Sequence, residues 1–195
     1  MHTIEPYFKW RDLYIASEDT ASPFYGTTYN EFSFTKKIYN YFIHPQWDNF
    51  GSPTLYTKIL YVDYDEHFAI LEFIGEWNDC VTNDIMHLKR NIVDQLIDQG
   101  ISKFVLVCEN VLNFHGSDEC YYEEWRDDVI DSNGWVVFMN TLDHIETEMR
   151  ETQLHHYVNL GEAFVQFDGR GAKPQNMINR IEEVLLSSHR SLQLP

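Results

Sequence analysis

FAILEFIG, residues 68–75, is the first of five segments that decide the fold. The others are DIMHLKRNIVDQLIDQ (84–99), KFVLVC (103–108), ECYYEEWRDDVI (119–130) and WVVFM (135–139). The first, third and fifth are rich in β-branched and aromatic residues and are predicted to be strands. The second has apolar residues at every third or fourth position, namely Ile85, Leu88, Ile92 and Leu96, which predicts a helix with one buried face. Strands that alternate with helices indicate a parallel sheet covered by helices.

The chain before residue 68 favours antiparallel structure. Leu55–Tyr64 and Phe68–Gly75 flank the short turn Asp65–Glu66–His67 and are predicted to pair as a hairpin. Residues 1–54 hold turn formers and many of the chain's Phe, Tyr and Trp side chains, so they are expected to cover apolar surface as an arm. Within the arm, Glu31–Ile43 is predicted to form a strand. We expect this arm to extend the sheet or to pair two subunits.

Beyond residue 140 the pattern predicts two more helices. Asp143 is a candidate N-cap for a helix that runs to about Val158, and Phe164–Phe167 suits a short additional strand. A last helix is predicted from Pro174, since proline is favoured in the first helical turn. The prediction is a single α/β domain over residues 1–195, with an extension (1–54), a core (55–158) and an extra strand and C-terminal helix (159–195). Its mixed sheet has parallel central strands, an antiparallel N-terminal hairpin and helices packed on it.

Composition restricts the class of protein. The chain has 31 acidic and 14 basic residues, a formal net charge of -17, so it would repel nucleic-acid backbones and anionic membranes. Cys80, Cys108 and Cys120 form no CxxC pair, which argues against a disulfide framework or a zinc site. No segment is typical of a signal peptide or a membrane span, so a cytoplasmic location is expected. No sequence pattern calls for a cofactor.

The turn NVLNFHGSD (110–118) is the most informative piece for function. It joins the carboxyl end of a central strand to a helix, which is where open α/β sheets place ligands and where free backbone N–H groups attract anions. Ser117, with Gly116 and His115, is therefore a candidate for phosphorylation or for anion binding. The alternative is that Ser117 or Asp118 only caps the helix.

Around this turn the chain resembles the STAS fold of the anti-sigma-factor antagonists. The segment KFVLVCENVLNFHGSD (103–118) is similar in layout to the strand and Asp-Ser-Ser-Gly turn of that family. In a gap-free overlay Ser117 falls on the family's second serine, Gly116 on its first serine and His115 on its aspartate, whereas Asp118 replaces its glycine. The resemblance covers about residues 55–158 and implies a non-enzymatic regulatory module in which phosphorylation of Ser117 switches a protein partner.

Two other functions stay open. An enzyme could use a pocket between the arm and the carboxyl ends of the sheet; its candidate residues are Arg11, Asp12, Asp19, His44, Asp48, Glu76, Asp79 and Glu109. Alternatively, the aromatic excess could be the interface of a homo-oligomeric structural protein. Two helical pairs, His144 with Glu148 and Glu151 with His155, have the spacing of metal ligands. Solvated surface explains those pairs better, and no metal site is predicted.

Overall fold

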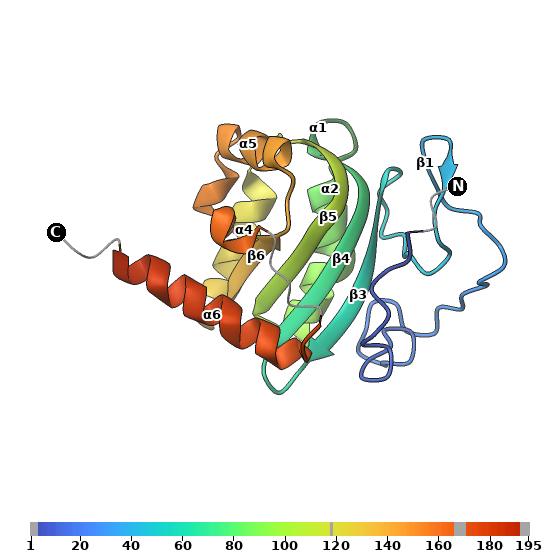
Figure 1. The fold of residues 1–195 in the computed structure, drawn as a ribbon, viewed down its shortest axis with the longest axis horizontal. Coiled ribbons are helices and arrows are strands. Elements are labelled where there is room, and N and C mark those ends of the chain that lie inside the picture. Colours follow the sequence, from blue (N-terminus) through green and yellow to red (C-terminus); the bar gives the residue numbers. More distant parts are fainter. Residues whose placement is uncertain (1–3, 118, 166–170, 192–195) are drawn as a thin grey trace.

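The computed structural model describes residues 4–117, 119–165 and 171–191, with side chains up to residue 187. A four-stranded sheet of order β3-β4-β5-β6 forms its centre (Figure 1). The strands are β3 (Leu55–Asp63), β4 (Phe68–Asn78), β5 (Lys103–His115) and β6 (Trp135–Met139). β3 and β4 are antiparallel, whereas β4, β5 and β6 are parallel. The predicted fold class, a hairpin that leads into parallel strands, is confirmed.

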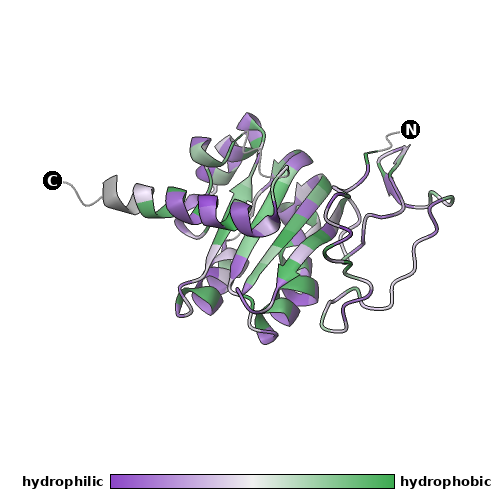
Figure 2. Cartoon of the chain, turned by 60° about the horizontal axis from the view of Figure 1, so that its bottom comes forward, coloured by the Kyte–Doolittle hydropathy of each residue, from purple (hydrophilic) through white to green (hydrophobic). Residues whose placement is uncertain are grey.

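Helices cover both faces of the sheet. On one face lie α2 (Asp84–Leu88), the π-helix η1 (Lys89–Val93), α3 (Asp94–Asp98), α4 (Cys120–Ile130) and α5 (Asp143–Glu151). Their apolar side chains join those of the strands in one large core cluster. On the other face α6 (Pro174–Ser191) crosses the strands and buries Met177, Ile178 and Ile181 against them (Figure 1). Because both faces are covered, the strands are hydrophobic along most of their length (Figure 2).

The N-terminal arm wraps around the outer edge of β3. Its strands β1 (Lys37–Ile38) and β2 (Tyr41–Phe42) form a short hairpin, so the prediction of a single strand over Glu31–Ile43 is wrong. The chain reverses at Tyr39, whose φ of 53° lies in the left-handed region. An antiparallel bridge between Asp48 and Thr57 adds the arm to the edge of the sheet. Pairing of two subunits through the arm stays a prediction.

Other boundaries also differ from the prediction. β5 continues seven residues beyond Cys108, so His115 belongs to the strand and not to the turn. α5 ends at Glu151, because Gln153 adopts a left-handed conformation before the 3-10 helix η2 (Leu154–His156). The N-cap of α5 is Leu142 and not Asp143. Residues 162–164 form the 3-10 helix η3 (Glu162–Phe164) where a strand was predicted to begin, and the end of that predicted strand lies outside the described residues.

None of the described helices is both long and apolar enough to cross a membrane.

Candidate functional site

The extended β5 carries the segment His115–Ser117 to the end of the sheet, beside α1 (Asp79–Thr82) and α5. Ser117 is exposed there. The N-cap of α4 is Glu119, whose side chain makes no capping hydrogen bond, so Ser117 is not the N-cap residue of this helix. Asp118, the other candidate for the cap, lies outside the described residues. The structure therefore presents the Ser117 hydroxyl at the surface.

Gly116 holds this loop in place through its backbone. Its N–H donates to Glu148 Oε1 of α5 at 3.2 Å, and its carbonyl accepts from the thiol of Cys80 in α1 at 2.6 Å. A Cβ atom at this position would lie 2.8 Å from Cγ2 and 2.9 Å from Oγ1 of Thr152. Any side chain here would have to displace the Thr152 side chain, so the packing favours glycine at this position.

His115 lies among polar neighbours. Its Nε2 is 2.9 Å from the amide nitrogen of Asn113, and its Nδ1 is 3.9 Å from Glu148 Oε1. Glu148 of α5 thus contacts both Gly116 and His115. Neither Glu148 nor Cys80 was expected at this turn, because their contacts join positions more than 30 residues apart in the sequence.

Asp79, the first residue of α1, fixes this helix to the core. It is buried and accepts hydrogen bonds from Trp77 Nε1 (3.0 Å), the Tyr122 hydroxyl (2.8 Å) and the backbone N–H of Ile85 (2.8 Å). Burial raises the pKa of Asp79 to about 6, although these three donors oppose the rise. With its oxygens occupied by the protein, Asp79 acts as a positioning residue for α1 and the adjacent Cys80.

The arm residues of the alternative pocket divide into separate clusters. Asp19 accepts from the Tyr14 hydroxyl at 2.9 Å and from that of Tyr64 at 2.5 Å. Asp48 is buried and binds the Tyr29 hydroxyl at 2.7 Å and Lys58 Nζ at 3.0 Å. These contacts fasten the arm to β3 and leave both carboxylates fully engaged.

The remaining members of that set also lie apart. Arg11 and His44 both contact Glu5, at 3.3 and 3.7 Å, and Arg11 lines a cavity of about 230 Å³ between the arm and β3. Asp12 is exposed, Glu76 is half-buried at the end of β4, and Glu109 lines a different cavity. Among the described residues, no single cavity gathers the eight residues, because the arm follows the side of β3 while Glu109 stands on β5.

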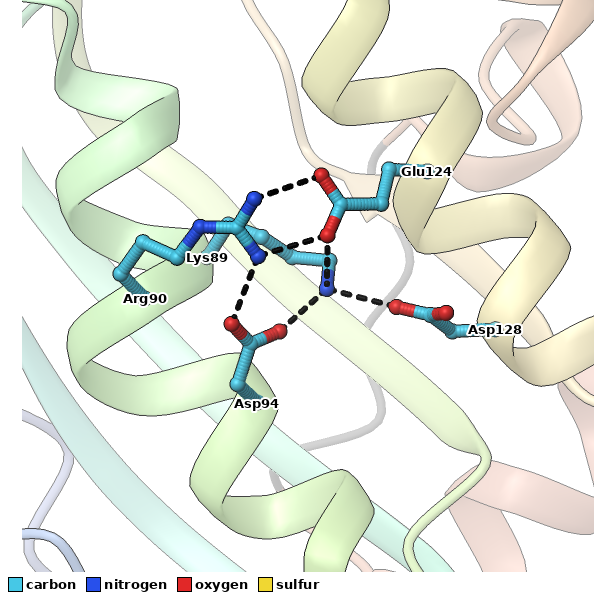
Figure 3. A network of polar contacts seen from close by, with 5 residues as sticks. All are labelled: Lys89, Arg90, Asp94, Glu124 and Asp128. Carbon is cyan, nitrogen blue, oxygen red and sulfur yellow. Dashed lines mark hydrogen bonds and ion pairs between the residues drawn. The ribbon is translucent and has the colours of Figure 1, made fainter.

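Another polar cluster joins the helices on one face of the sheet (Figure 3). Lys89 of η1 is buried, and its Nζ contacts Asp94, Asp128 (2.6 Å) and Glu124 (3.5 Å). Arg90 forms a bidentate pair with Glu124 and reaches Asp94. Burial alone would lower the pKa of Lys89, but the carboxylates outweigh it and the net shift is upward. In the described part of the chain, these three acids are the one group spaced to hold a metal ion, and the Lys89 ammonium occupies their centre.

The pairs His144/Glu148 and Glu151/His155 take no part in such a cluster within the described residues. His144 Nε2 lies 3.1 Å from the Leu112 carbonyl, and Glu148 binds the Gly116 loop. Cys108 is buried, and burial raises the pKa of its thiol. Cys120 is exposed.

No family model and no curated protein matches this sequence. Among solved structures, the chain is similar to the Bacillus cell fate determinant SpoIIAA in its phosphorylated form, with a TM-score of 0.41, 11% identity and coverage of 64% of this chain and 98% of that chain. It is also similar to the unphosphorylated form, described as an anti-sigma factor antagonist (TM-score 0.43, 10% identity, 65% and 97% coverage). A candidate anti-sigma factor antagonist from Thermotoga maritima gives 0.40, 16% identity, and 54% and 84% coverage.

SpoIIAA and the Thermotoga maritima protein are described as anti-sigma factor antagonists, which is the family that segment 103–118 resembles.

Proposed function

We propose that the chain is a non-enzymatic regulatory module that binds a protein partner through the end of the sheet bearing Ser117. Phosphorylation of Ser117 would control that contact. The observation that carries the proposal is the exposed position of Ser117 on a loop whose backbone is fixed by Glu148 on one side and Cys80 on the other. A modifying enzyme and a partner can both reach such a hydroxyl.

The surroundings of Ser117 give a physical reason for a switch. A phosphoryl group adds nearly two negative charges and three strong acceptors. It would compete with the Glu148 carboxylate for the Gly116 N–H, and the two anions would repel each other. The N-terminus of α4 follows directly and its N–H groups favour an anion, although Glu119 and Glu123 at this end offset part of that attraction. Phosphorylation would thus draw the loop toward α4 and loosen its contact with α5.

The test uses the full chain and four forms of it: wild type, Ser117→Ala, Ser117→Asp and the control Ser132→Asp. Ser132 is exposed in the turn before β6, at the opposite end of the sheet. Peptide mass spectrometry of protein from its native host should find phosphate on Ser117. Partners recovered by wild type and Ser117→Ala should bind Ser117→Asp at least about tenfold more weakly, a cost of about 1.4 kcal/mol. They should bind the control Ser132→Asp as tightly as they bind wild type. Equal binding by all four forms would refute the switch.

A further inference from the structure

A cavity of about 610 Å³ lies at the amino end of β6, the outermost strand of the sheet. The end of α4, the segment around η2 and the second half of α6 surround it. The Ser117 loop lies at the other end of the sheet, beyond the carboxyl end of β5. None of the contacts that fix that loop involves a residue of this cavity. The cavity is therefore a separate feature of the molecule.

Apolar side chains from two helices line this cavity and reach the solvent. Ile130 of α4 is 46% exposed, and Leu186 of α6 is 61% exposed. Leu185 follows Ile181 by about one helical turn, but it is only partly buried, because α6 projects past β6 at this end (Figure 1). Exposed apolar side chains that gather around a hollow are typical of a surface that another protein covers.

The charged lining of the cavity comes from the same two helices. Among the described residues that line it, Arg126 of α4 is the one lysine or arginine and Glu182 of α6 is the one acid. They are not paired with each other, since Arg126 contacts Asp127 at 3.1 Å and Glu182 contacts Lys103 at 2.7 Å. A guanidinium group has five donors, and a carboxylate can accept several hydrogen bonds. Both groups can therefore take a further partner of opposite charge.

These features make the surface complementary to itself. In a two-fold dimer the same patch meets itself, so each contact occurs twice with the roles exchanged. The patch offers both members of each contact: a hollow and a projecting apolar helix end, and an arginine and an acid from different helices. Because the chain has a net charge of -17, two copies repel each other wherever acid meets acid. A surface that joins Arg126 to Glu182 avoids that repulsion.

We propose that two copies of this chain form a symmetric dimer through this cavity. The projecting ends of the two α6 helices would lie side by side, so that Leu185 and Leu186 of each copy cover the cavity of the other. Arg126 of each copy would pair with Glu182 of the partner subunit. This inference goes beyond the regulatory function and does not depend on Ser117.

The oligomeric state of the full chain tests the proposal. Sedimentation velocity at about 0.15 M salt, where repulsion between acidic copies is screened, should show wild type changing from monomer to dimer over micromolar concentrations. Leu186→Glu should weaken the dimer at least about tenfold, because it places a charge in an apolar contact. The matched control Leu112→Glu changes a leucine that is 52% exposed outside the cavity, and it should dimerise as wild type does. A wild type that stays monomeric, or equal dimerisation by the two variants, would overturn the proposal.

A charge exchange identifies the pair across the interface. Arg126→Glu and Glu182→Arg should each stay monomeric when alone, since like charges then meet at both contacts. An equal mixture of the two should form a heterodimer, because each contact again joins an arginine to a glutamate. Glu66→Arg, in the exposed turn between β3 and β4, is the control and should dimerise alone. Circular dichroism should show that all variants are folded. If the mixture fails to associate while Glu66→Arg dimerises, this interface is refuted.

Discussion

At the scale of single residues, Asp79 is the carboxylate in the described structure whose pKa is shifted upward. Its pKa is raised to about 6 because burial penalises the carboxylate, and the hydrogen bonds from Tyr122, Ile85 and Trp77 offset only part of that cost. In an unfolded chain an aspartate titrates near 4. The folded state therefore binds the proton more tightly, so the stability from protonated Asp79 is fully present below about pH 4 and is lost as the pH rises through about 6.

Asp79→Asn should remove this pH dependence while keeping an oxygen for Trp77 and Ile85. The variant should therefore gain stability relative to wild type as the pH rises. The difference between their free energies of unfolding (variant minus wild type) should increase by about 2 kcal/mol from pH 4.5 to pH 7.5. Urea denaturation at the two pH values measures the difference. The exposed Asp65→Asn serves as control and should show almost no such change. A constant difference between Asp79→Asn and wild type at both pH values would mean that Asp79 does not titrate in this range.

The sequence identified the position of Ser117 but could not identify its neighbours. The strand-to-helix turn was readable from the apolar run before it and the helical pattern after it. The contacts of Gly116 with Glu148 and Cys80 join elements 32 and 36 positions away in the chain, and no local pattern encodes them. The cavity at the amino end of β6 is likewise a property of packing alone.

At the scale of elements, the helical segment from Asp84 to Asp98 contains an unexpected buried cation. Its apolar residues Ile85, Leu88, Ile92 and Leu96 are buried as their spacing predicted. Lys89 lies four positions after Ile85, and so on the same stripe, and its side chain is 1% exposed. The periodicity could place Lys89 inward. It could not show which charges compensate it, because Glu124 and Asp128 come from another helix.

Lys89→Met should lower the free energy of unfolding by only about 1 kcal/mol, because Asp94, Glu124 and Asp128 lose their central counter-charge but are about one-third exposed and can be hydrated. The ligand oxygens of these three acids lie within 4.8 Å of one another, so calcium should take the place of the ammonium group. Thermal unfolding should show that millimolar calcium raises the melting temperature of Lys89→Met and not that of wild type.

Lys89→Met combined with Asp128→Asn is the matched control for that experiment. Loss of one ligand should abolish the calcium effect in the double variant. If calcium stabilises the single and double variants equally, the ion binds elsewhere on the acidic surface.

At the scale of the whole molecule, the arm is an integral part of the hydrophobic core. Trp10 packs with the α6 side of the sheet, whereas Phe50 belongs to the cluster on the opposite face. Trp47 is fully buried with Tyr56 and Ile74, and its indole donates to the Ile4 carbonyl at 2.8 Å. The aromatic excess predicted a covering role for the arm, and its path around β3 could not be predicted because its turns have no regular period.

Two substitutions within the arm test this role. Trp47→Ala should lower the free energy of unfolding by about 3 to 5 kcal/mol, the usual cost of removing a large buried aromatic side chain. Phe32→Ala removes a side chain that is 96% exposed, so stability should change by about 0.5 kcal/mol or less. Urea denaturation followed by circular dichroism measures both values. Similar small losses for the two variants would show that the arm is a loosely attached extension.

The indole of Trp10 donates to the carbonyl of Ala172, at 3.1 Å and 162 positions along the chain. This contact has a consequence for biosynthesis. The arm is translated first, yet its docking surface is complete only after the start of α6 has been made. At roughly 5 to 20 residues per second, the ribosome needs on the order of ten seconds or more to cover that distance. During this time the aromatic arm is a nascent chain without its final contacts, open to chaperones and to neighbouring polypeptides.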